Sequence, residues 1–209
     1  MGVNRHQDYA YIGNAVPNNL HWLDVKKMRD AGFRIIRSAH YPQDPAFMDA
    51  CDELGMFIIV ATPGWQYWNP ELVFEERILS DIRNMVRRDR NHPSVLLWEP
   101  VLNETAFPES FAQNAYRATH EEYPAPGCYA AIDDKSKGAM GYDVVYTAPK
   151  NEAFYRNAGK SCFTREYGDC VDDWNSHNSY SRVAREWGEE PQIRQAQHYA
   201  RKDYGGSLT

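Results

Sequence analysis

Two glutamates in the sequence have the residue type and the placement needed for acid–base and covalent chemistry. Glu104 ends the run LLWEPVLNE and Glu166 lies in FTREYGD, and each follows an apolar segment typical of a buried strand. A pair of carboxyl groups suits cleavage of a glycosidic bond, because one group protonates the leaving oxygen while the other attacks or stabilises the anomeric carbon. A reaction that retains configuration needs the two groups about 5 Å apart. The pair therefore predicts glycoside hydrolysis, provided that the fold brings both side chains together.

Further polar side chains stand where other apolar runs end. Taken singly, each is explained equally well as a loop residue or a satisfied buried polar group. Two glutamates that converge with histidine, arginine and tyrosine are harder to explain by structural need alone. The residues at these strand ends are Asn4, His6, Asp8, Arg37, Ser38, His40, Thr62, Gly64, Trp65, Asn103 and Tyr146.

The elements that must position these residues alternate along the chain. Seven short runs rich in Ile, Val, Phe and Tyr predict strands, because turn residues bound each of them. Apolar positions three and four residues apart predict helices in most of the gaps. The predicted strands are 2–6, 34–40, 56–61, 94–102, 128–132, 143–146 and 161–167, with the start of another at 205–209; the predicted helices are 20–31, 47–54, 74–85, 110–122, 150–158 and 192–202.

Alternating strands and helices predict an α/β fold with a parallel sheet. Seven strands and a partial eighth favour a (β/α)8 TIM barrel over an open doubly wound sheet. Such barrels usually need about 250 residues, so we expect the 209 residues to form one catalytic barrel domain, 1–209, as a fragment of a longer multidomain protein that lacks the end of the last strand and its helix. The polar, glycine-containing segment 133–141 predicts no helix after the fifth strand.

Composition excludes several classes of partner. A formal charge of −6 argues against nucleic acid or an anionic membrane as the main partner. The longest apolar run, 57–61, is too short to span a bilayer. Aromatic residues make up 13% of the chain, which fits either an ordinary core or rings that stack on sugars.

The four cysteines, Cys51, Cys128, Cys162 and Cys170, contain no CxxC pair, so a zinc ribbon or thioredoxin-type site is not expected. Cys51 lies in a helical pattern and Cys162 in a strand pattern, which predicts buried thiols. The cysteines are compatible with a location in the cytoplasm, in the periplasm or outside the cell.

Four segments together carry a family resemblance. They read GVNRHQD, IIRSAHYPQDPAFMDACDELGMFII, NHPSVLLWEPVLNET and FTREYGD, in that order. The sequence resembles the catalytic TIM barrel of glycoside hydrolase family 2, which includes β-galactosidases, β-glucuronidases and β-mannosidases. Each piece alone would be weak, but the combination of RSAHYP, NE and EYG is specific.

The resemblance implies a role for each matching residue. Glu104 corresponds to the general acid/base and Glu166 to the nucleophile. Asn103 would hydrogen-bond the sugar 2-hydroxyl, and Arg37 would hold the carboxylate of the nucleophile. The histidines that line the sugar subsite correspond to His6 and His40, and a tyrosine near the nucleophile corresponds to Tyr146.

The sequence also departs from the family pattern. The segment VATPGWQYW lacks the acidic residues that some members use for metals, so we predict no metal ligand there. Trp65 in this segment is either a wall that stacks on the sugar or a loop anchor on the barrel rim. Glu99 stands five residues before Glu104, which places it below the strand end and indicates a structural residue.

The expected function is that of a retaining exo-β-glycosidase without a cofactor, acting on terminal β-linked sugars, with β-galactosides as the expected substrates. The substrate would be an oligosaccharide or other glycoside, and the full-length protein could form an oligomer. Glucuronidase or mannosidase activity, a catalytically incomplete carbohydrate-binding barrel, and a metal-dependent hydrolase built on His6, Asp8 and His40 are the alternatives.

Overall fold

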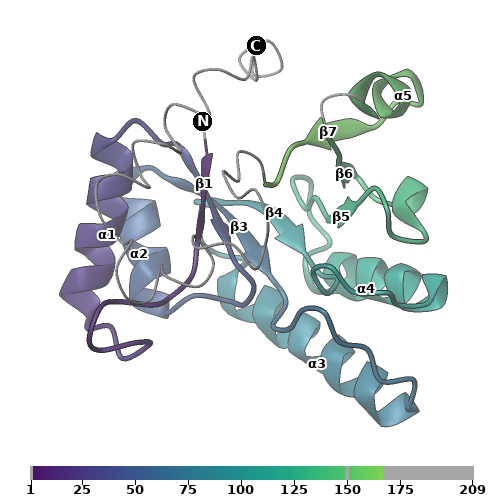
Figure 1. Cartoon of the computed structure of the whole chain (residues 1–209), viewed down its shortest axis with the longest axis horizontal. Helices are drawn as coiled ribbons and strands as arrows, with labels where there is room; N and C mark the ends of the chain where they lie inside the picture. The colour runs from purple at the N-terminus through teal and green to yellow at the C-terminus, as the bar shows by residue number, and fades with distance from the viewer. Residues whose placement is uncertain (1, 149–150, 167–209) are drawn as a thin grey trace, which may run out of the picture. The chain divides into compact units, whose positions relative to one another are not determined.

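The computed structural model describes residues 2–148 and 151–166 (Figure 1). The chain divides into two compact units, Met1–Phe163 and Thr164–Thr209, and each is considered by itself. Of the second unit, residues 164–166 are described. The predicted helix 192–202 and the predicted strand start 205–209 lie outside the described residues.

Strands and helices alternate through the first unit, as the sequence predicts. The strands are β1 (Gly2–Arg5), β2 (Ile35–Ser38), β3 (Phe57–Ala61), β4 (Val95–Glu99), β5 (Ala131–Asp133), β6 (Val144–Tyr146) and β7 (Ser161–Phe163). The helices are α1 (Asn18–Asp30), α2 (Pro45–Leu54), α3 (Leu72–Asp89), α4 (Glu109–Glu122) and α5 (Glu152–Asn157).

All strand pairs in this unit are parallel. One sheet has the order β1-β2-β3-β4 and the other the order β5-β6-β7. An isolated parallel bridge between Trp98 and Ala130 links the end of β4 to the residue before β5. Seven parallel strands in sequential order, each next to its neighbour along the chain, are the arrangement expected of a (β/α)8 barrel.

The positions of the first seven predicted strands are confirmed, although each observed strand is shorter than the predicted run. The absence of a helix after the fifth strand is also confirmed within the described residues. Between β5 and β6 the chain forms only the short 3₁₀ turn η1 (Ala139–Gly141). Polar residues and glycine fill this connection, so it has no apolar stripe that could pack as a helix.

Local signals explain where the helices begin and end. The Asp44 side chain caps α2 by accepting a hydrogen bond from the Ala46 amide at 2.8 Å, and Pro45 occupies the first turn. Gly55 ends α2 in the left-handed conformation, with φ of 66°, which glycine adopts without steric cost.

The basic turn 87–90 closes α3 and does not form a free positive patch. Arg87 makes a bidentate pair with Glu122 of α4, at 2.7 and 2.6 Å, and Arg88 pairs with Asp89. Cations also complement the carboxyl end of a helix dipole. These contacts tie α3 to α4, which pack side by side (Figure 1).

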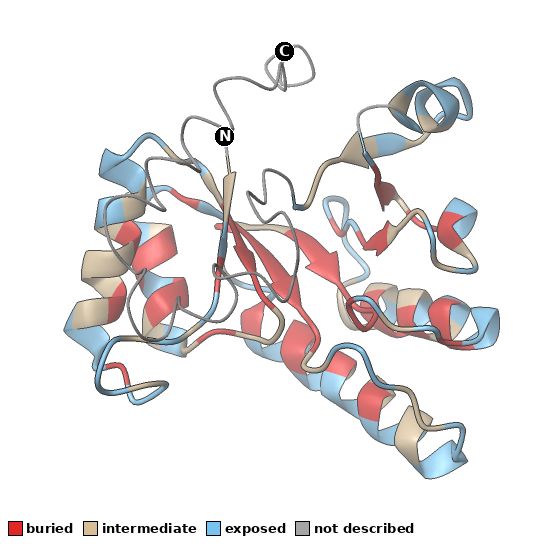
Figure 2. Ribbon diagram, in the orientation of Figure 1, coloured by how far each residue is buried: buried red, intermediate tan, exposed pale blue. Residues whose placement is uncertain are grey.

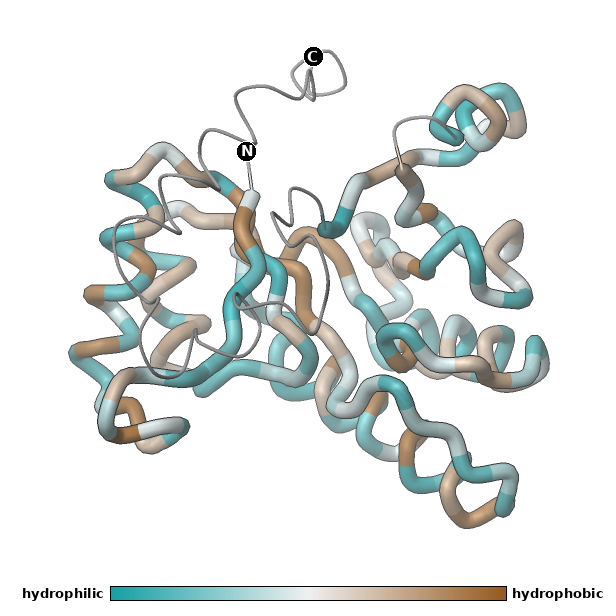
Figure 3. The backbone as a smooth tube through the Cα atoms, viewed as in Figure 1, coloured by the Kyte–Doolittle hydropathy of each residue, from teal (hydrophilic) through white to brown (hydrophobic). Residues whose placement is uncertain are grey.

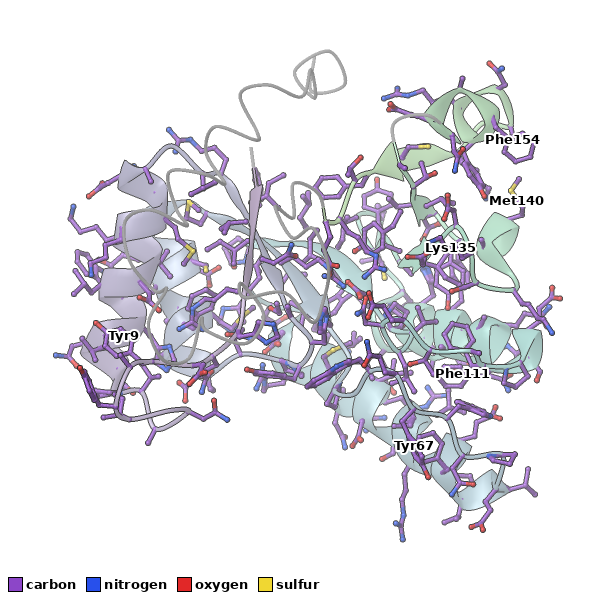
Figure 4. The ribbon with its side chains drawn as sticks, in the orientation of Figure 1. Tyr9, Tyr67, Phe111, Lys135, Met140 and Phe154 are labelled. Atoms are coloured by element: carbon purple, nitrogen blue, oxygen red, sulfur yellow. The ribbon has the colours of Figure 1, made fainter. Side chains whose placement is uncertain are left out.

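The core lies between the strands and the helices. Figure 2 shows β2, β3 and β4 of the first sheet as largely buried, and Figure 3 shows the strongest apolar character along the central strands. Phe47 and Met48 of α2 pack with Ile58 and Trp98 in one cluster. A second cluster surrounds the fully buried Phe111 of α4, labelled in Figure 4, whose ring centroid lies 4.8 Å from that of Trp68. This packing holds the strand ends in fixed positions.

No helix in the described part of the chain is both long enough and apolar enough to cross a membrane.

The cysteines differ in burial. Cys51 on α2 is fully buried, as predicted, and Cys128 is also buried. Cys162 on β7 is only half-buried, so the prediction of a buried thiol is wrong at this position. None of the three residues of β7 is buried: Ser161 is exposed, and Cys162 and Phe163 are intermediate.

We expect Cys51 to resist alkylation in the folded protein. Burial raises the pKa of its thiol to about 12. Because the thiolate is the reactive form, about one molecule in ten thousand is competent near pH 8. Peptide mapping by mass spectrometry after iodoacetamide treatment should find Cys51 unmodified in the native protein and modified in concentrated urea. Rapid native labelling would contradict the packing described for α2.

Candidate active site

The carboxyl ends of β1 to β4 lie at one edge of the first sheet, because the strands are parallel neighbours. Asn4 is paired in register with Arg37, and Ala61 with Glu99. The chain continues from β4 into Asn103 and Glu104, and from β3 into Trp65 and Gln66. A parallel bridge between Trp65 and Asn103 extends the β3–β4 pairing beyond the strands themselves. The predicted site residues of these strands therefore meet at one edge.

A buried ion pair forms the floor of this group. Arg37 donates to Glu99 through Nε at 2.7 Å and through Nη2 at 2.5 Å. Each side chain is only 3% exposed. Charged hydrogen bonds of this bidentate kind fix geometry strongly, since the guanidinium plane and the carboxylate plane must match. Arg37 thus has a defined orientation at the centre of the site.

Asn103 lies directly above this pair. Its Oδ1 accepts a hydrogen bond from Arg37 Nη2 at 3.2 Å, and its Nδ2 lies 3.4 Å from His40 Nε2. The guanidinium is a donor only, so the oxygen of the Asn103 amide must face Arg37. The backbone carbonyl of Asn103 accepts from the amide of Gln66 at 3.0 Å. Hydrogen bonds therefore fix both the side chain and the backbone of Asn103.

Glu104 occupies an unusual backbone conformation. Its φ of 48° lies in the left-handed region, as does that of Gln66, at 58°. Such residues are uncommon outside glycine and cluster at functional sites, where surrounding contacts maintain the conformation. Gln66 Nε2 donates to Glu104 Oε2 at 2.7 Å. The Glu104 side chain is exposed and oriented by this contact.

Aromatic rings complete the group. The His6 and His40 rings meet edge to face at 5.6 Å, and the Trp65 ring lies 5.6 Å from that of His40. Trp65 remains 45% exposed, as a ring that receives a ligand must be. The Arg37 guanidinium stands 5.8 Å from the centre of the Tyr146 ring.

The structure brings together all but one of the predicted site residues. A chain of contacts joins them within the first unit: His6, Arg37, His40, Trp65, Asn103 and Tyr146, with Glu104 next to Asn103. Glu166 follows β7 by three residues and belongs to the second unit, where Arg165 Nη1 lies 3.3 Å from its Oε1. The approach of Glu166 to Glu104 and to Arg37 stays a prediction.

Sequence reasoning missed two contacts. It treated Glu99 as a structural residue below the strand end and did not predict that Arg37 pairs with it. Opposite charges on two neighbouring buried strands were the available signal. Nothing in the sequence marked the contact of Gln66 with Glu104, because it depends on the path of a loop.

Other clusters of polar residues lie at the opposite ends of the strands. Asp52 accepts from the amide of Ser94 at 3.0 Å and contacts His92 just before β4. Asp143, just before β6, contacts Tyr116 and His120, and burial together with this carboxylate raises the pKa of Tyr116 to about 12. In a barrel the amino ends of the strands serve stability, so we assign these clusters to the scaffold.

Among the described residues, no group of three or more His, Cys, Asp or Glu side chains is arranged to hold a metal ion.

Parallel strands with intervening helices, and polar side chains gathered at the carboxyl ends, define the class of (β/α)8 barrel proteins. Residues 1–125 match the family described as "Glycosyl hydrolases family 2, TIM barrel domain", and the chain belongs to this family.

Individual relatives agree with this assignment. A β-galactosidase of Thermoanaerobacterium thermosulfurigenes is 38% identical over 125 residues, which cover 59% of this chain and 17% of that protein. A β-glucuronidase of Streptococcus agalactiae is 23% identical over 201 residues, covering 88% of this chain and 32% of that protein. The chain thus spans about a sixth to a third of the length of these relatives.

The fold comparison gives the same result. The crystal structure of an FMN-binding β-glucuronidase from Facaelibacterium prausnitzii L2-6 has a TM-score of 0.70 and 22% identity, covering 80% of this chain and 30% of that one. At this identity the likeness concerns the fold. It confirms the TIM barrel predicted from the sequence.

Proposed function

We propose that this chain carries the catalytic site of a retaining exo-β-glycosidase that removes terminal β-linked sugars, with β-galactosides as preferred substrates. The observation that supports it most is the placement of Asn103 and Glu104 after β4, where Arg37, His40 and Gln66 contact their side chains. A carboxyl group at this position can protonate the glycosidic oxygen, and the neighbouring amide can hydrogen-bond the sugar 2-hydroxyl.

In this proposal Glu104 acts as general acid and then as general base. Glu166 attacks the anomeric carbon and forms a glycosyl-enzyme, which releases the leaving group as Glu104 donates its proton. Water then attacks the same carbon as Glu104 takes up a proton from it, and the bond between that carbon and Glu166 breaks. The two successive inversions retain the anomeric configuration. Trp65 and the two histidines would line the sugar subsite.

The choice of sugar rests on the relatives. The β-galactosidase of Thermoanaerobacterium thermosulfurigenes has the higher identity, whereas the β-glucuronidase of Streptococcus agalactiae aligns over more of the chain. β-Glucuronides are therefore the second candidate substrates. Mannosidase activity and a barrel that binds sugars without turnover are the remaining alternatives.

A panel of nitrophenyl β-glycosides tests the proposal on the intact protein. We expect the β-galactoside to give a kcat/KM at least about tenfold above the β-glucuronide and β-mannoside, a difference of one well-placed polar contact. Preference for the glucuronide would transfer the proposal to the second candidate. Sugar binding by calorimetry with no hydrolysis of any substrate would indicate a non-catalytic barrel.

A further inference from the structure

We propose that Glu99 is a positioning residue of this site, whose carboxylate orients Arg37 and through it the side-chain amide of Asn103. The inference rests on the proposed function, because it assigns Glu99 a part in that reaction. It concerns a residue that stands at the end of β4, five positions before the acid/base.

The first step is the contact between Glu99 and Arg37. Two hydrogen bonds, from Nε and from Nη2, fix the guanidinium both in position and in rotation about its own plane. Both side chains are almost fully buried. In such surroundings a charged hydrogen bond is stronger than in water, and loss of one partner leaves the other charge uncompensated.

The second step is the contact between Arg37 and Asn103. The same Nη2 that donates to Glu99 also donates to Asn103 Oδ1, at 3.2 Å. A side-chain amide has two orientations that exchange its oxygen and nitrogen. A fixed donor on one side selects the orientation with the oxygen toward Arg37, and Nδ2 then faces His40.

The consequence concerns the transition state. A hydrogen bond to the sugar 2-hydroxyl strengthens as the oxocarbenium ion develops. If Asn103 makes this bond, the orientation selected by Glu99 and Arg37 acts mainly on kcat and hardly on KM. A substrate without the 2-hydroxyl cannot use the bond, whatever the orientation of Asn103.

Comparison of substrates with and without the 2-hydroxyl therefore distinguishes a positioning residue from a residue that only stabilises the fold. Glu99→Gln keeps the shape of the side chain but removes its charge and one acceptor. For an aryl β-galactoside we expect kcat to fall about 30-fold with KM within about threefold, as for loss of a charged hydrogen bond. For the aryl 2-deoxy-β-galactoside we expect kcat to fall by less than about threefold, because this substrate lacks the hydroxyl that Asn103 would contact.

Asp52→Asn is the matched control. Like Glu99, Asp52 pairs with a basic side chain, but it lies at the amino end of β4, where it also accepts a hydrogen bond from the Ser94 amide. This variant should lower the midpoint of thermal unfolding and change kcat for the two substrates by the same small factor. Glu99→Asp provides a second variant if Glu99→Gln folds poorly, since it keeps the charge and withdraws the carboxylate from the two Arg37 donors. We expect it to show the same selective loss on the 2-hydroxyl substrate.

Equal losses on the two substrates, or wild-type rates in a folded Glu99 variant, would overturn the inference. Its failure is distinct from failure of the proposed function. A wild-type protein that hydrolyses no glycoside refutes the function, whereas an active wild type with equal losses refutes only the role of Glu99.

Discussion

Replacement of Glu166 with glutamine is expected to reduce kcat for an aryl β-galactoside by roughly 10⁴-fold or more, the loss that follows removal of a catalytic nucleophile. Glutamine has nearly the same size but cannot form the glycosyl-enzyme ester. The measurement is steady-state hydrolysis by the intact protein, with circular dichroism to confirm that the variant is folded.

Glu152→Gln serves as the control for this variant. Glu152 forms an ion pair with Arg156 within α5, so its loss should leave kcat at the wild-type value. Substantial residual activity of Glu166→Gln would remove Glu166 from the nucleophile role. The first product seen by NMR provides an independent check, because a β anomer indicates retention and an α anomer indicates inversion.

Glu104→Ala should reveal the general acid by its dependence on the leaving group. We expect kcat/KM to fall by about 10³-fold for an alkyl β-galactoside, whose leaving oxygen needs a proton. A dinitrophenyl β-galactoside leaves without that proton, so its kcat/KM should fall by less than about tenfold. Rates for a series of leaving groups of graded acidity measure this trend.

Azide provides a second readout for Glu104→Ala. The glycosyl-enzyme of this variant lacks the base that activates water, and azide, which needs no base, should restore turnover and yield a β-glycosyl azide. Glu109→Ala, at an exposed position in the first turn of α4, should behave as the wild type with and without azide. Equal losses for all leaving groups would contradict the acid role.

The fold could be predicted from the sequence because its signals are local. Most of the described strands lie in a short apolar run bounded by turn residues, and α2 carries both its cap, Asp44, and its stop, Gly55. The missing helix between β5 and β6 was predictable for the same reason, since the segment 133–141 has no apolar periodicity. Strand lengths were overestimated because pairing ends before the apolar run does.

The site was predictable only as far as strand ends and motifs define it. His6, Arg37, His40, Asn103 and Tyr146 come together because neighbouring parallel strands end at one edge. The contact of Gln66 with Glu104 and the pairing of Glu99 with Arg37 depend on loop path and side-chain direction, which spacing along the chain does not determine. Trp65 lies beside His40 and is 45% exposed, and both roles considered for it, stacking on the sugar and anchoring the loop, stay predictions.

The two hydrogen bonds of Gln66 constrain how this scaffold could be re-engineered. Exchange of the segment between β3 and α3 is an obvious way to alter which leaving groups a barrel enzyme accepts. Here Gln66 of that segment also donates its backbone N–H to the carbonyl of Asn103 and its side-chain amide to the carboxylate of Glu104. A grafted loop must therefore supply a backbone N–H and a side-chain donor at the position of Gln66. A loop chosen only for its leaving-group contacts would lose the support of Asn103 and Glu104, and turnover with it.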